Sequence, residues 1–135
     1  MSGIPSHVRP YCMRIGESAT VAYYRIDVAM IHPVVLVIDH DDRLVGTITK
    51  ARLTGLTQAG ERLDSATVEQ VCVPSYPRID AASDIYASGR AIFAESELDI
   101  LPVVNERGEP VDIFARWQAF FLDHYRRHQL RYNFY

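Results

Sequence analysis

The sequence has few of the residues that mark secreted, membrane or metal-binding proteins. Its 135 residues include only two cysteines, Cys12 and Cys72, which form neither a disulfide framework nor a CxxC motif. The longest apolar run, Val34 to Ile38, is far too short to cross a bilayer, and Met1 to Tyr11 lacks the apolar core of a secretory signal. We therefore expect a soluble, cytoplasmic protein with two small buried thiols and no membrane partner.

Positive charge is also scarce. Lys50 is the single lysine, and 14 basic residues face 17 acidic ones, for a formal net charge of -3. A general nucleic-acid binder needs many cations to neutralise phosphates, so we expect no nucleic-acid partner. The sequence has no nucleophile–base pairing, phosphate-binding loop or metal signature. It therefore predicts neither an enzyme, nor a metal site, nor a required cofactor.

What the sequence does contain is an internal repeat within a chain rich enough in apolar residues (48%) to form a core. Residues 34–49 align without gaps with residues 100–115, at an offset of 66 positions. Each copy has an apolar run, a short polar turn and a second apolar run. One unit of about 60 residues would bury only a marginal core, so we expect the two units to pack against each other.

Each copy of the repeat predicts a β-hairpin. The first runs are continuous and rich in β-branched residues, as in strands covered on both faces. Gly108 suits a reversal, and Pro110, which cannot donate to a ladder, should begin a strand. The expected strands and turns are Val34–Ile38, Asp39–Arg43 and Leu44–Ile48 in the first copy, then Ile100–Val104, Asn105–Glu109 and a strand from Pro110 in the second.

Helical patterns flank each hairpin. Ala19 to Ile31 predicts a helix that buries Val21, Tyr24, Val28 and Ile31, ended by Pro33; Ser83 to Glu97 predicts one that buries Ile85, Ser88/Gly89, Ile92 and Phe93, with Ser83 as N-cap. Further helices are expected over Lys50–Gln58, from a Ser65 cap to Val71, and over Arg116 to about Leu130, where Trp117, Phe120, Phe121, His124 and Tyr125 share one side.

Short opening strands near Met13 and Ile79 would complete two β-α-β-β-α units. The predicted fold class is α+β, with the two units packed sheet to sheet around a pseudo-twofold axis. Its expected divisions are an N-terminal extension (1–9), a first repeat (10–72), a second repeat (73–124), and a helix end with an aromatic tail (125–135).

The two hairpin sequences resemble those of a tandem pair of CBS domains, also called a Bateman module. The stretches that carry the resemblance are Val37-Ile-Asp-His-Asp-Asp-Arg-Leu-Val-Gly-Thr-Ile-Thr49 and Leu101-Pro-Val-Val-Asn-Glu-Arg-Gly-Glu-Pro-Val111, within a region covering roughly residues 10 to 125. Either stretch alone is a weak match, whereas two at this spacing, with helices around them, make a fairly specific signal.

The resemblance implies a ligand site in the cleft between the repeats. Family members typically bind adenine nucleotides or S-adenosylmethionine derivatives there, through a Gly-x-x-Thr/Ser-x-x-Asp motif. Gly46 and Thr49 match this motif, but Arg52 replaces the aspartate that would hold the ribose. The ligand-binding residues implied in the first repeat are Val37, Ile38, Gly46, Thr47, Ile48, Thr49, Lys50 and Arg52.

A purely structural interpretation of the same residues stays open. In it, Gly46 serves packing, Thr49 caps a helix and Arg52 is solvated; in the functional one, Arg52 and Lys50 favour additional phosphates. The second repeat departs further from the motif, with Asp112, Ala115 and Gln118 at the three positions. A second cleft around Pro102, Val103 and Asp112 would repel phosphate, so we expect a nucleotide to prefer the cleft beside Thr49.

The function implied is a regulatory module that senses AMP, ADP, ATP or S-adenosylmethionine, forms a homodimer and acts on a regulated enzyme or transporter. The alternative is a degenerate pair that serves only for dimerisation or partner docking, without a ligand.

The C-terminal region has two further features that could bind a ligand or partner. His124 and His128 have metal-ligand spacing but no third ligand, which favours a solvated pair; the tail from Tyr125 favours docking on a second subunit over single-stranded nucleic acid.

Overall fold

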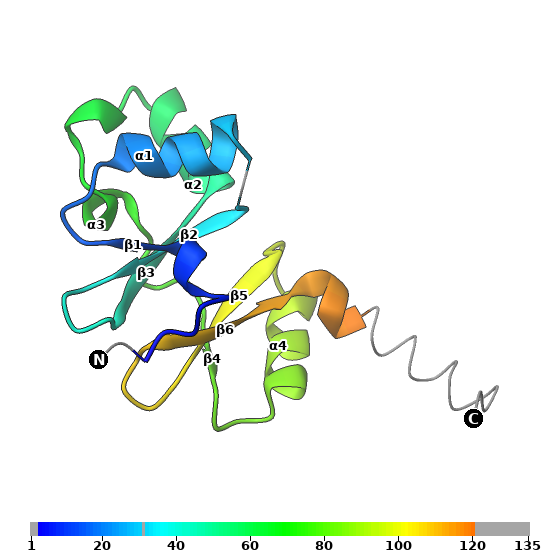
Figure 1. Cartoon of the computed structure of the whole chain (residues 1–135). Coiled ribbons are helices and arrows are strands. Elements are labelled where there is room, and N and C mark those ends of the chain that lie inside the picture. Colours follow the sequence, from blue (N-terminus) through cyan, green and yellow to red (C-terminus); the bar gives the residue numbers. More distant parts are fainter. Residues whose placement is uncertain (1–2, 31, 121–135) are drawn as a thin grey trace.

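Two three-stranded sheets pack face to face in the computed structural model, which describes residues 3–30 and 32–120, and helices cover their outer faces (Figure 1). The first repeat comprises β1 (Cys12–Arg14), α1 (Ala19–Tyr23), the π-helix η2 (Tyr24–Val28), β2 (Val34–Ile38), β3 (Leu44–Thr49), α2 (Lys50–Gln58), the 3-10 helix η3 (Leu63–Ser65) and α3 (Val68–Val71). The second comprises β4 (Ile79–Asp80), α4 (Ile85–Ala94), β5 (Ile100–Val104) and β6 (Pro110–Ala115), and residues 116–120 begin a further helix.

The two sheets repeat each other residue by residue at the offset of 66 found in the sequence. Their strand orders are β1-β2-β3 and β4-β5-β6, each with a parallel first pair and an antiparallel hairpin. Met13 pairs with Val37 as Ile79 pairs with Val103, and a register shift follows Val37 and Val103 alike. The predicted α+β fold of two related units is therefore confirmed, including the short opening strands.

Both hairpins turn in the same way with different residues. Asp42 has a φ of +64° and Gly108, its equivalent, a φ of +81°. Glycine adopts this left-handed backbone freely, whereas aspartate does so at a cost. The Asp42 carboxylate accepts a bond of 2.9 Å from the Arg14 guanidinium, which helps to hold the turn. Asp39 and Asn105 each use a side-chain oxygen to accept backbone N–H bonds inside their own turn.

The apolar core has three parts that follow from strand alternation. Val35 and Val37 face the helices of the first repeat, and Leu101 and Val103 pack with α4 in the second. The opposite faces of the two sheets meet in a central core. The central core consists of Ile4, Val8, Val34, Leu36, Ile38, Leu44, Ile100, Val104 and Ala115.

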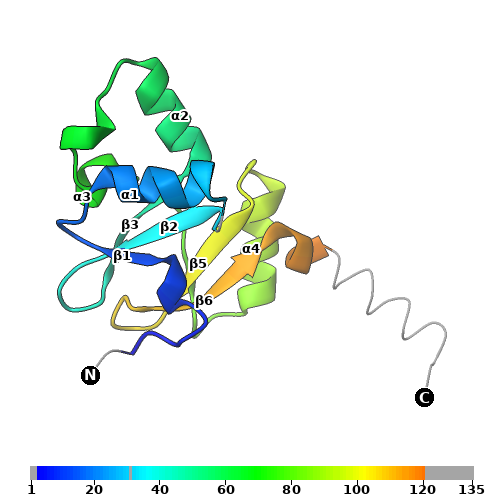
Figure 2. The same ribbon diagram turned by 45° about the horizontal axis from the view of Figure 1, so that its top comes forward.

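The N-terminal segment takes part in this central core. Val8 is fully buried and Ile4 is 5% exposed, both against strands of the two sheets. In Figures 1 and 2 the blue segment runs along the junction of the sheets. The residues from Gly3 to Arg9, expected as an extension before the first repeat, thus join the two repeats together.

The helix from Ala19 is shorter than predicted, and the predicted buried stripe is wrong. The α-helix gives way to a π-helical turn at Tyr24, which ends at Val28, before Pro33. Ala19, Ala22 and Ile26 are the buried residues, and the two small alanines let the helix lie close to the sheet. The predicted stripe faces outward instead: Val21 is 43%, Tyr24 56% and Val28 57% exposed, and Ile31 lies outside the described residues.

Two predicted caps are also corrected. Asp84, not Ser83, caps α4 by accepting from the Ala87 N–H, and the helix ends at Ala94 rather than Glu97. Ser65 ends a 3-10 turn, whereas Thr67 is the N-cap of α3 and donates its backbone N–H to the Gln70 side-chain oxygen. The helix from Arg116 is described only to residue 120, so Phe121, His124 and Tyr125 lie outside the described residues.

Two glycines show where backbone approach is tight. A Cβ on Gly46 would lie 2.7 Å from the Cys72 sulfur and 2.9 Å from the Val73 carbonyl, so this glycine lets β3 contact the link between the repeats. A Cβ on Gly89 would lie 2.4 Å from the Phe114 ring, so α4 can lie directly on β6. Within 3–30 and 32–120, no helix is long and apolar enough to span a bilayer.

We predict that Gly89→Ala destabilises the protein although alanine favours helices. The added methyl overlaps the Phe114 ring, and overpacking of this kind costs about 1–3 kcal/mol. Gly55→Ala on α2 is the matched control, because nothing lies within 4 Å of its Cβ position and the change should stabilise by up to about 1 kcal/mol. Urea unfolding measures both; equal stabilisation by the two substitutions would contradict the packing described here.

Candidate ligand-binding groove

A groove of about 420 Å³ lies between the two repeats, beside the end of β3. The twofold arrangement creates it, because the segments that enter β2 and β5 occupy equivalent positions and both lie at its edge. Thr49, Lys50 and Ala51 contribute the start of α2, and Tyr76 comes from the link between the repeats. The residues that line the groove are Ile26, Met30, His32, Pro33, Val34, Thr49, Lys50, Ala51, Tyr76, Glu97, Leu98, Asp99 and Ile100.

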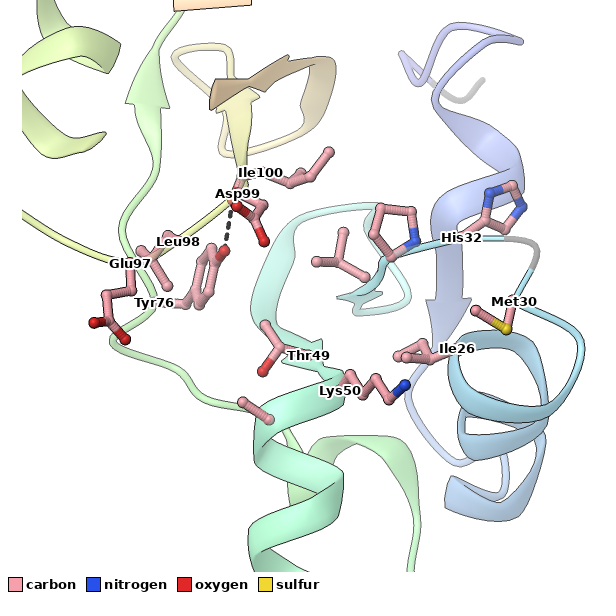
Figure 3. A pocket seen from close by; sticks show the side chains of 13 residues that line it. Ile26, Met30, His32, Thr49, Lys50, Tyr76, Glu97, Leu98, Asp99 and Ile100 are labelled. Atoms are coloured by element: carbon pink, nitrogen blue, oxygen red, sulfur yellow. Dashed lines mark hydrogen bonds between the residues drawn. The ribbon is translucent and has the colours of Figure 1, made fainter. Parts of the chain in front are cut away.

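The two walls of the groove differ in chemistry. Ile26, Met30 and His32 lie on the wall from the first repeat, and Tyr76 and Asp99 lie on the facing wall (Figure 3). Tyr76 donates its hydroxyl proton to the Ile100 carbonyl at 2.5 Å. Burial, and the nearby Asp99 carboxylate, raise the pKa of Tyr76 to about 12, so the phenol stays protonated. The groove thus pairs apolar surfaces with a few fixed polar groups, as small-molecule sites do.

Thr49 and Lys50 form the floor of the groove at the start of α2. The Thr49 hydroxyl oxygen accepts from the Arg52 N–H at 3.1 Å, so this threonine is the helix cap. Its hydroxyl proton is left to donate, and the first N–H groups of the helix lie beside it. The Lys50 ammonium lies 3.4 Å from the Asp27 carboxylate and is 61% exposed.

The charges around the groove are mixed. Glu97 and Asp99 line it along with Lys50. Partial burial, and to a lesser extent Arg25, lower the pKa of His32, so its imidazole is neutral at pH 7. Arg116 donates to the carbonyls of Leu98 at 2.9 Å and Ser96 at 2.6 Å, which fixes the loop that carries the two carboxylates.

Of the predicted ligand-binding residues in the first repeat, the structure brings Thr49 and Lys50 to the groove. Val37 and Ile48 are fully buried beneath the helices, and Ile38 lies in the central core. Gly46 and Thr47 face the link between the repeats, where the Thr47 and Val73 backbones exchange bonds of 3.2 and 2.9 Å. A role for any of these residues in ligand binding stays a prediction.

Arg52 does not line the groove. Its Nε donates to the Val71 carbonyl at 3.0 Å, which ties the start of α2 to the end of α3. Arg52 is exposed apart from this bond, which agrees with the solvated interpretation, and its role toward a phosphate stays a prediction. The packing interpretation of Gly46 and the capping interpretation of Thr49, in contrast, both describe contacts present in the structure.

At the second cleft the structure has a smaller depression of about 310 Å³. Pro102 and Val103 are buried in β5 and do not line it, whereas Asp112 does, with its carboxylate 3.2 Å from the His7 imidazole. Gln118, at the position of the missing aspartate, accepts from the Ala115 N–H at 2.8 Å and so caps its own helix. Trp117 is 61% exposed at the rim of this depression.

Sequence reasoning missed the residues that enter the strands. Pro33 and Asp99, and likewise His32 and Leu98, are equivalent in the two repeats and line the same groove. The offset of 66 could have indicated these residues, because a twofold axis brings the equivalent starts of two strands together. Of the two thiols expected to be buried, Cys72 is buried and Cys12 only partly so; burial raises the pKa of Cys12 to about 11 and also raises that of Cys72. Among the described residues, no three His, Cys, Asp or Glu side chains gather as metal ligands would.

Comparison with known proteins shows a shared fold at low sequence identity. No family model and no curated protein matches the sequence. A CBS domain-containing protein of unknown function from Bacillus anthracis superposes with a TM-score of 0.71 at 22% identity, over 85% of this chain and 84% of that one.

Two further solved structures contain nucleotides. CBSX2 in complex with AMP has a TM-score of 0.70 at 19% identity, over 86% of this chain and 88% of its own. The CbpB protein of Listeria monocytogenes in complex with c-di-AMP has a TM-score of 0.68 at 20% identity, over 93% of this chain and 95% of its own. The chain therefore has the fold of a tandem pair of CBS domains.

Proposed function

We propose that this chain is a regulatory module that senses an adenine nucleotide or a related adenosyl ligand in the groove between its repeats. The observation that carries the proposal is the groove itself. It has about 420 Å³ of space, contributions from both repeats, and a polar floor at Thr49 and Lys50. This volume is within the range of small-molecule sites.

The chemistry of the groove fits the parts of such a ligand. The side chains of Ile26, Val34 and Ile100 line the groove and would give an adenine base apolar contacts. The Thr49 hydroxyl, the Lys50 ammonium and the first N–H groups of α2 suit one phosphate or another small anion. The bound nucleotides of CBSX2 and CbpB, proteins of the same fold, support this assignment.

The charges favour a ligand with few phosphates. Lys50 is the one lysine or arginine that lines the groove among the described residues, and two carboxylates lie on the same surface. Arg52 and Arg116 are held by backbone carbonyls. AMP, or an adenosyl ligand without phosphate such as S-adenosylmethionine, is therefore favoured over ATP and ADP.

A ligand in the groove would act through the contact between the repeats. Because both repeats line the groove, binding stabilises their present arrangement, and a regulated enzyme or transporter could respond to it. We propose this role in a cytoplasmic homodimer without catalytic activity of its own.

We predict that AMP raises the melting temperature of the protein and that Lys50→Gln weakens this effect. A ligand at a hundredfold excess over its Kd stabilises by about 2.7 kcal/mol, which corresponds to roughly 8 °C for a chain of this size. Removing the ammonium should weaken AMP binding about three- to tenfold without unfolding the protein, because Lys50 is 61% exposed. Thermal shift followed by calorimetric titration measures both.

Arg62→Gln is the control for the lost positive charge. Arg62 is 80% exposed, pairs with Asp64 and does not line the groove, so its removal should leave AMP binding unchanged. ADP, ATP and S-adenosylmethionine complete the series, and ATP should bind no tighter than AMP. If none of these ligands shifts the melting temperature at millimolar concentration, the sensing function is excluded.

One observation favours the alternative function, a module for self-association without a ligand. Val21, Tyr24 and Val28 form an exposed apolar surface on the first helical segment, next to Met30, which is 71% exposed. Side chains of this size are costly to leave in water and often mark protein contacts. A second copy of the chain would cover them, in agreement with the expected homodimer.

We predict that the wild-type protein is a dimer and that Tyr24→Arg combined with Val28→Glu converts it to a monomer. Both side chains are more than half exposed, so the fold should survive. Light scattering on a sizing column measures the mass, and Thr54→Glu on the exposed side of α2 is the control. A dimer whose mass and stability do not change with any nucleotide supports the alternative function. A mass that changes with nucleotide rejects it. A monomeric wild type contradicts both the sensing homodimer and the ligand-free self-association module.

A further inference from the structure

The groove lacks a carboxylate where the CBS resemblance would place one. Position 52, the expected ribose-binding aspartate, is an arginine whose Nε is bonded to the Val71 carbonyl at 3.0 Å. Its main-chain N–H is bonded to Thr49. Among the described residues that line the groove from the start of α2, namely Thr49, Lys50 and Ala51, none is a carboxylate that could accept from a pair of sugar hydroxyls.

A carboxylate does enter the groove from the opposite repeat. Asp99 precedes β5 and lies on the wall that faces the start of α2, near Tyr76 (Figure 3). Its side chain is 85% exposed, so a ligand can reach it. Tyr76, on the same wall, is fixed by its hydrogen bond to the carbonyl of Ile100, the residue that follows Asp99.

The neighbours of Asp99 fix its position without occupying all of its hydrogen-bond acceptor sites. The Arg116 Nε lies 3.7 Å from one carboxylate oxygen and is itself bonded to the Leu98 carbonyl, so the second oxygen keeps its acceptor sites. Arg116 also bonds the Ser96 carbonyl, which fixes the loop on which Asp99 stands. A carboxylate with acceptor sites on two oxygens suits two adjacent hydroxyl donors.

We propose that Asp99 accepts the hydrogen bonds of the ribose hydroxyls of the bound ligand, in place of the carboxylate absent from position 52. This inference rests on the proposed function. It assigns ribose recognition to the second repeat and anion recognition, through Thr49 and Lys50, to the first. The ligand then bridges the repeats through polar contacts on both sides.

Glu97 also lines the groove but is placed differently. In Figure 3 its carboxylate points away from Thr49 and from the space between the walls, whereas Asp99 stands over that space. Among the described carboxylates that line the groove, Asp99 is therefore the one positioned for a sugar.

Calorimetric titration with AMP, 2′-deoxy-AMP and 3′-deoxy-AMP tests the assignment. The wild-type protein should bind AMP about five- to tenfold more tightly than either deoxy analogue, because each analogue lacks one donor to the carboxylate. Asp99→Asn should lower AMP affinity to the level of the analogues and remove the discrimination. Glu95→Gln, which removes an exposed carboxylate outside the groove, should keep it.

The outcomes separate the two proposals. Equal wild-type binding of AMP and both analogues, or full discrimination in Asp99→Asn, overturns the role of Asp99 and leaves the sensing function in place. The role of Asp99 is also overturned if Glu97→Gln, and not Asp99→Asn, removes the difference in affinity between AMP and its deoxy analogues. Absence of AMP binding to the wild type overturns the sensing function, and the ribose contact with it. Melting temperatures of the variants without ligand confirm that each is folded.

Discussion

The contact between the two sheets is the constraint on which the rest of this structure depends. Each repeat has three strands, of which the first is only two or three residues long, and neither sheet can cover its inner face alone. Leu36 and Ile38 from one sheet meet Ile100 and Val104 from the other, and Val8 from the N-terminal segment closes the same core. Burial of this shared apolar surface makes the two repeats one folding unit.

The groove is a consequence of this contact. Packing two equivalent hairpins around a twofold axis places the segments before β2 and β5 at one edge, where the start of α2 adds its N–H groups. What distinguishes this chain is the choice of side chains there. Lys50 and Thr49 come from one repeat, Asp99 from the other, and Arg52 is used to tie two helices together. The ligand would thus be shared by the two halves that the core already joins.

The repeat made most of the fold predictable from the sequence. Strand bounds in both hairpins followed from apolar runs and from Pro110 and Gly108, because these residues restrict the backbone locally. The buried face of the first helix was harder to predict, since its alanines are buried while its larger apolar side chains are exposed. A π-helical turn also alters the helical spacing. The groove was predictable at Thr49 but not at Tyr76 or Asp99, because which loops meet there depends on tertiary packing.

Native-state hydrogen exchange at low denaturant tests the shared core most directly. We predict that the slowest amides of β2 and β5 exchange with the same free energy, equal to that of global unfolding, because neither sheet survives without the other. If the amides of one repeat exchange through an opening of distinctly lower free energy while the other stays protected, the repeats are independent units and the account is contradicted.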